Sequence, residues 1–152
     1  MKPVVWWWRH VRGAALAVGG MLALSGSVLA QAPQDPAYQS PGEGWVISGI
    51  ANEYVQWTYI NNIARNGNNL RVWVINNYKE GNYINYGAKS RRTLFECECF
   101  NKRIRQINIS IFSEVSARGK TIISSDDDFS AAWSSVAPGT MGEAIIEVAC
   151  SR

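Results

Sequence analysis

Residues 93–105 read Thr-Leu-Phe-Glu-Cys-Glu-Cys-Phe-Asn-Lys-Arg-Ile-Arg and carry two of the three cysteines of the chain, the third being Cys150. Side chains alternate between the two faces of a strand, so Cys97 and Cys99 would lie side by side on one face. We predict an interior strand that a disulfide joins to the C-terminal segment. A single pairing with Cys150 leaves one thiol over, and these residues alone leave open which one.

The first thirty residues are typical of a secretory signal peptide. Basic residues near the start precede an apolar run at 13–24 and small residues at 28–30. We expect cleavage after Ala30 rather than after Ala32, because cleavage after Ala32 would make Pro33 the first mature residue. The alternative, a membrane anchor, is disfavoured because the apolar run falls short of the roughly 20 residues that span a bilayer, and we expect no membrane span in the mature chain. No cysteine follows this position directly, so a lipid-anchored amino terminus is not expected. The predicted location is the periplasm, the outer cell surface or the medium.

Removal of this leader changes the charge balance. The chain has 15 Lys and Arg residues against 12 Asp and Glu, and three of the basic residues lie in the leader, so twelve of each sign remain. A net charge of zero argues against nucleic acid as a partner. The only histidine, His10, lies in the leader too. The mature chain therefore lacks the residue for a His-activated nucleophile or a His-ligated metal.

The mature chain reads as one domain made of short strands. Residues 31–43 contain three prolines and are expected to form a flexible lead-in to a domain at 44–152. The Asn66-Gly67 turn is expected to join the second strand to the third. The expected strands are rich in β-branched and aromatic residues and lie at 44–50, 53–60, 70–77, 90–100, 103–112 and 121–125.

The last element is expected to be a helix that ends at Cys150. Thr140 and Glu143 form a capping box, and apolar residues then recur at helical spacing. A helix of about ten residues is marginal alone in water, so we expect it to pack on the sheet. The predicted fold class is α+β: an antiparallel sheet of about six strands with a C-terminal helix packed on it and tethered by a disulfide.

Catalysis has little support. Glu96 and Glu98 on one strand imitate a glycosidase pair, but two such carboxylates usually form a solvent-facing rim, and we expect that here. Cys97 and Cys99 do not have the Cys-x-x-Cys spacing of redox and zinc sites. The aspartates at 126–128 are more typical of a solvated turn than of a calcium loop. We predict a protein that is not an enzyme and that has no metal site and no cofactor.

Binding is better supported. Residues 52–62 and 76–86 are rich in Tyr, Trp and Asn, which suit contact surfaces. The alternative is that Trp57, Trp73 and Trp133 lie in the core and that the Tyr and Asn residues complete loops. Basic residues around the central strand would meet an acidic partner or pair with neighbouring glutamates. The candidate binding face comprises Tyr78, Tyr83, Tyr86, Arg91, Arg92, Lys102, Arg103 and Arg105.

An ordered set of residues runs through the whole domain. It consists of Trp45, residues 59–61 (Tyr-Ile-Asn), Arg65, Gly67, residues 72–78 (Val-Trp-Val-Ile-Asn-Asn-Tyr), Ser90, Glu98, Cys99, Arg103, Arg105, Trp133, residues 138–140 (Pro-Gly-Thr), Glu143 and Cys150. This order resembles the bacterial surface-adhesin protein E family, over residues 44–151. The resemblance implies a small exported α+β domain of the envelope that binds host extracellular-matrix or plasma proteins.

The resemblance also implies which thiols pair. Cys99 occupies the family-like position ahead of Arg103 and Arg105, so a Cys99–Cys150 disulfide is expected and Cys97 is the spare thiol. We favour burial of Cys97 as an inert side chain, whereas an exposed Cys97 would link two copies into a dimer. The alternative function is a periplasmic protein with a structural role, or one that binds small ligands or glycans through its Tyr and Asn loops.

Overall fold

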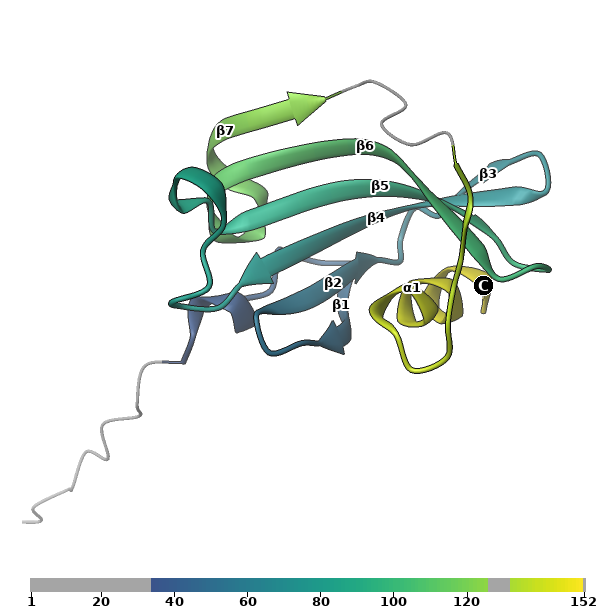
Figure 1. The fold of residues 1–152 in the computed structure, drawn as a ribbon, viewed down its shortest axis with the longest axis horizontal. Helices are drawn as coiled ribbons and strands as arrows, with labels where there is room; N and C mark the ends of the chain where they lie inside the picture. Colours follow the sequence, from purple (N-terminus) through teal and green to yellow (C-terminus); the bar gives the residue numbers. More distant parts are fainter. Residues whose placement is uncertain (1–33, 126–131, 152) are drawn as a thin grey trace, which may run out of the picture. The chain divides into compact units, whose positions relative to one another are not determined.

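The computed structural model describes residues 34–125 and 132–151, and both the expected leader and the aspartates at 126–128 lie outside these residues. The described residues form one antiparallel sheet with a single α-helix, α1, against one of its faces (Figure 1). The strands pair in the order β1-β2-β4-β5-β6-β7, while β3 pairs with β4 and β8 pairs with β6. The elements are η1 (Pro36–Tyr38), β1 (Trp45–Ile50), β2 (Tyr54–Tyr59), β3 (Ala64–Asn66), β4 (Asn69–Tyr78), η2 (Asn85–Gly87), β5 (Ser90–Glu98), β6 (Arg103–Glu114), η3 (Val115–Ala117), β7 (Arg118–Ser125), β8 (Ser134–Ser135) and α1 (Met141–Cys150).

All six predicted strands are present, and the α+β class with a packed C-terminal helix is confirmed. One predicted connection was wrong. The turn at Gly67, which has a φ of +61°, joins β3 to β4, whereas the prediction joined β2 to β4. The physical reason is that β2 and β3 pair with successive parts of β4, with Thr58 opposite Val74 and Asn66 opposite Asn69.

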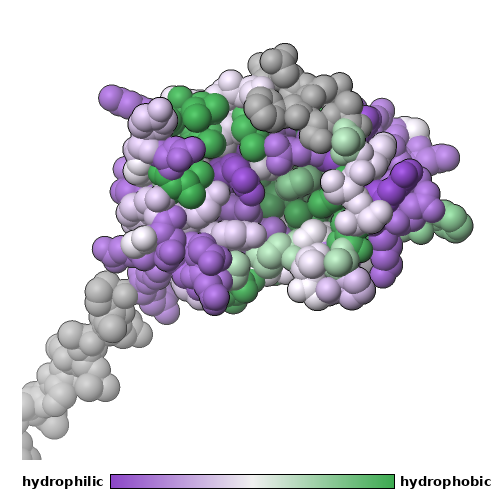
Figure 2. Space-filling model, viewed as in Figure 1, coloured by the Kyte–Doolittle hydropathy of each residue, from purple (hydrophilic) through white to green (hydrophobic). Residues whose placement is uncertain are grey.

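One hydrophobic core lies between α1 and the sheet. Val72 and Val74 of β4 pack with Ile145, Ile146 and Ala149 of α1, because the apolar positions of each element recur on one side. We call this side of the sheet the helix-bearing face. Figure 2 shows it with apolar side chains at its centre, between α1 and β7, bordered by hydrophilic ones.

The helix is fixed at both ends. Thr140 Oγ1 accepts a hydrogen bond from the backbone N–H of Glu143, and the Glu143 carboxylate accepts one from Gly139 N, one residue earlier than in the usual capping box. At the other end, Cys99 and Cys150 form a disulfide with their Cα atoms 5.8 Å apart, which confirms the expected pairing. The disulfide joins the end of α1 to the residue that follows β5.

A second core lies on the opposite face of the sheet. It contains Ala37, Val55, Trp57 and Ile75, and Trp57 Nε1 donates a hydrogen bond to Ala37 O at 3.2 Å. The predicted flexible lead-in therefore differs from the structure at residues 36–38, which form η1 and close this core. The reason is that Trp57 and Ile75 face away from α1 and need apolar cover on their own side.

Candidate binding face

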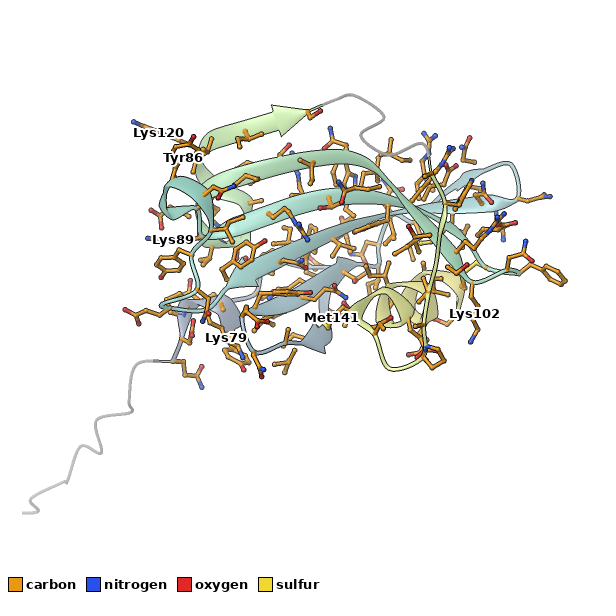
Figure 3. The ribbon with its side chains drawn as sticks, viewed as in Figure 1. Lys79, Tyr86, Lys89, Lys102, Lys120 and Met141 are labelled. Atoms are coloured by element: carbon orange, nitrogen blue, oxygen red, sulfur yellow. A yellow bond between two sulfur atoms is a disulfide. The ribbon has the colours of Figure 1, made fainter. Side chains whose placement is uncertain are left out.

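The eight residues predicted to form a binding face lie in several places. Tyr78 is buried, whereas Tyr86 in the β4–β5 connection is 88 % exposed. Lys102 follows the other end of β5, near Glu143 of α1 at 3.7 Å, so Tyr86 and Lys102 lie at opposite ends of the sheet (Figure 3). Arg91 and Arg92 are consecutive in β5 and point to opposite faces.

Arg92, Arg103 and Arg105 share the face opposite α1. Register places them beside charged and aromatic side chains of the neighbouring strands, and Trp133 lies over two of them. We call this surface the arginine–aromatic face and define it as Arg71, Trp73, Arg92, Glu96, Glu98, Arg103, Arg105, Phe112 and Trp133. Its four arginines and two glutamates leave a formal surplus of two positive charges.

Arg92 has the most unusual environment on this face. Its guanidinium carbon lies 5.0 Å from the centre of the Trp73 ring and 5.3 Å from that of Phe112, which are cation–π distances. Its Nε atom is buried and has no hydrogen-bond partner. No ion pair joins Arg92 to a carboxylate within residues 34–125 and 132–151. The aromatic rings therefore hold a positive charge that no acid among the described residues neutralises.

Glu96 contradicts the expectation of an exposed carboxylate, since its side chain is 0 % exposed. Asn66 Nδ2 and Arg105 donate hydrogen bonds to it, the latter from Nε at 2.6 Å, and Arg71 Nε lies 3.7 Å away. Burial by itself would raise the pKa of Glu96, but these hydrogen bonds and the two arginine charges outweigh it and lower that pKa. Glu96 is thus an ionised group that joins β3, β4 and β6.

The other acid pairs with its hairpin partner. Arg103 Nε donates to Glu98 at 2.6 Å, and Asn101 Nδ2 donates to the same carboxylate at 2.7 Å. Trp133 lies over this region, with its ring centre 5.6 Å from the guanidinium of Arg103 and 4.9 Å from that of Arg105. Arg103 and Arg105 therefore pair with glutamates, the alternative that the sequence left open, and both also lie within cation–π distance of Trp133.

Of the three tryptophans that the alternative interpretation places in the core, only Trp57 is fully buried; Trp73 and Trp133 are half-buried against arginines. Sequence reasoning missed the roles of Trp73, Phe112 and Arg71 on this face. Strand alternation put Trp73 and Arg71 on one side of β4, but only the register between strands brings them to Arg92 and Glu96.

The remaining thiol has no reactive character. Cys97 is fully buried beside α1, as expected. Burial, with a smaller contribution from the negative charge of Glu96, raises its pKa to about 12, so the nucleophilic thiolate is scarce at neutral pH. A dimer through Cys97 stays a prediction that requires this thiol to leave the core.

Two further properties concern only the residues that the structure describes. No group of three or more His, Cys, Asp or Glu side chains there is arranged to hold a metal ion. No helix there has both the length and the apolar character needed to cross a membrane.

The fold and this surface together define a small α+β domain with one disulfide, a helix on one face of the sheet and arginines stacked on aromatic rings on the other. The chain belongs to the surface-adhesin protein E family, whose family model matches residues 45–151. The match confirms the resemblance and spans β1 to α1. Searches of curated proteins and of solved structures gave no match.

Proposed function

We propose that this chain is an exported, non-enzymatic binding module of the bacterial envelope, and that its arginine–aromatic face binds acidic segments of host extracellular-matrix or plasma proteins. Membership of the surface-adhesin protein E family supports an adhesin-like role at the surface. The choice of face rests on the chemistry of its residues, since aromatic and arginine side chains dominate the energetics of protein interfaces.

The observation that carries the proposal is the position of the Arg92 charge between Trp73 and Phe112, where no carboxylate of residues 34–125 or 132–151 pairs with it. The two rings limit the rotamers of the guanidinium, so little side-chain entropy is lost when it contacts a carboxylate. Arg103 and Arg105 contribute less charge because Glu98 and Glu96 already pair with them. Arg92 is therefore the expected centre of contact with an acidic partner.

A non-enzymatic role is consistent with the state of the reactive groups. The Glu96 carboxylate is committed to Asn66, Arg105 and Arg71, and the Cys97 thiol is protonated and buried. Neither group is positioned to reach a substrate, because both side chains have no exposed surface.

The first experiment tests location and binding together. Intact cells that express the chain are treated with a protease, and the purified chain is applied to immobilised extracellular-matrix and plasma proteins. The proposal expects cleavage on intact cells and salt-sensitive retention by at least one of these proteins, since charge contacts weaken as salt rises. A chain that is protected until the outer membrane is opened, and that none of these proteins retains, would contradict it.

A second candidate is glycan binding, and it rests on the exposed Tyr86. This residue has a φ of 60° and ψ of 25°, a left-handed conformation that non-glycine residues rarely adopt. Tyr83 lies nearby in the same connection with Lys89 Nζ 5.7 Å from its ring centre. Exposed tyrosine rings offer flat surfaces on which sugar rings stack. Retention on a glycan array that a Tyr86→Ala variant loses, with no binding to proteins, would favour this candidate.

A further inference from the structure

A row of five side chains crosses the helix-bearing face next to the core. The register places Gln56, Asn76, Arg91, Ile111 and Ile123 opposite one another on β2, β4, β5, β6 and β7. Residues that are directly opposite in antiparallel strands share a face, and neighbouring strands lie about 4.8 Å apart. The row therefore changes along its length from two amides through a guanidinium to two aliphatic side chains.

Arg91 is half-buried in the middle of this row, and its guanidinium pairs with no acid of the described residues. Its Nε is buried without a hydrogen bond, and no ion pair joins it to an acid in the described part of the chain. Its neighbour is the phenol of Tyr78, whose pKa is raised by burial and pulled in the opposite direction by the Arg91 charge. A phenol that stays neutral at physiological pH does not neutralise the guanidinium.

Asn76 stands next to Arg91 and also has an unsatisfied group. It is 5 % exposed, and its Oδ1 is buried with no donor. Gln56, the next residue of the row, differs because its Nε2 donates to Ser48 Oγ at 3.1 Å and to Met141 O at 3.0 Å. Buried polar atoms are nearly always hydrogen-bonded, so two adjacent exceptions indicate a site whose partner comes from a ligand. That ligand must supply an acceptor to Arg91 and a donor to Asn76.

The other end of the row is apolar. Ile111 is buried, and Ile123 on the edge strand β7 is 39 % exposed. Ile109 lies on the same side as Ile111, two residues earlier in β6. These side chains belong to β6 and β7 on the helix-bearing face, and Figure 2 shows apolar surface on this face between α1 and β7. A ligand that reached Arg91 would thus have aliphatic surface beside it.

We propose that this row binds the carboxyl-terminal residue of a peptide, an N-acylated α-amino acid with an apolar side chain. The carboxylate accepts hydrogen bonds from Arg91, the amide N–H of the same residue donates to Asn76 Oδ1, and the side chain packs on Ile111 and Ile123. The three groups are attached to one α-carbon, and the residues that contact them lie on the four successive strands β4, β5, β6 and β7. Tyr54 and Tyr78, whose ring centres are 5.9 Å apart, flank the site. This site lies on the face opposite the arginine–aromatic face and is independent of the proposed function.

The test is calorimetric titration of the purified chain with N-acetyl-L-leucine and with a short peptide that ends in leucine. The same peptide with an amidated carboxyl terminus is the control ligand. The free carboxylate is expected to bind at least tenfold more tightly than the amide, since a bidentate contact to arginine is lost. Equal binding of acid and amide, or no binding of either, would overturn the proposal.

Two variants locate the site. Arg91→Gln is expected to lower the affinity for the free acid at least tenfold, whereas Arg65→Gln, which removes one positive charge at an exposed position on β3, leaves it unchanged. Asn76→Asp keeps the size of the side chain but sets a carboxylate beside Arg91, so it is expected to abolish binding without unfolding the chain. Retained binding in both Arg91→Gln and Asn76→Asp would refute the assignment. Tighter binding of an acidic sugar such as glucuronic acid than of N-acetyl-L-leucine would also refute the assignment.

Discussion

The Cys99–Cys150 disulfide should account for a large part of the stability of this domain. We take a chain with Cys97→Ala as the reference, so that no third thiol can exchange with the disulfide, and compare it with the same chain carrying Cys99→Ala and Cys150→Ala. The two cysteines are 51 residues apart in the sequence. In the chain-entropy description, opening a loop of this length lowers the free energy of unfolding by about 4 kcal/mol.

This loss is severe because domains of this size are stable by only about 5–15 kcal/mol. The loss of stability should be greatest in α1, since a ten-residue helix is marginal without its contacts to the sheet. Urea unfolding of both proteins at pH 7 measures the difference, and the slope with urea should rise in the disulfide-free chain because its unfolded state is more expanded. Amide exchange in residues 141–150 should accelerate most. A loss below about 1 kcal/mol, with unchanged exchange in the helix, would refute this reasoning.

Three further predictions follow from buried groups and from the helix cap. Glu96→Gln should lower the free energy of unfolding by about 3 kcal/mol at pH 7, because it removes the charge that faces Arg105. The lowered pKa of Glu96 means that this stabilisation is present above the ordinary value of 4.5 and is lost as pH falls through the lower folded value, so the two proteins should converge in acid; a pH-independent difference would contradict the ion-pair account. Cys97 should resist a thiol reagent at pH 8 until denaturant is added, and rapid labelling of the native chain would show that it is accessible. Thr140→Ala should cost about 1 kcal/mol in thermal or urea unfolding, and no change would mean that its bond to Glu143 N contributes little.

The fold was largely predictable because its main elements carry strong local patterns. The long strand β6 alternates clearly, β4 is rich in β-branched and aromatic residues, and the cap at Thr140 marks the start of the helix. The short strands β3 and β8 span three and two residues, too few to show an alternation. The packing of residues 36–38 depends on apolar side chains that face them from β2 and β4, and a Pro-rich composition gives no sign of it.

The candidate site was less predictable because it depends on register. Alternation alone places consecutive residues such as Arg91 and Arg92 on opposite faces of a strand. The predicted binding face nevertheless contained both arginines. The burial of Glu96 arises from groups on β3, β4 and β6, of which those on β3 and β4 are distant in the sequence. The aromatic rings around Arg92 likewise come from β4 and β6. Which strands lie side by side, and with which residues opposite, is information that no local pattern contains.

The most direct test of the proposed binding face compares Arg92→Gln with Lys120→Gln in the same assay. Both variants remove one positive charge, but Lys120 lies on β7, at an exposed position outside the arginine–aromatic face. Binding to the matrix or plasma protein that retains the wild-type chain should fall at least tenfold in Arg92→Gln and stay unchanged in Lys120→Gln. Equal binding by the two variants would contradict the assignment of this face.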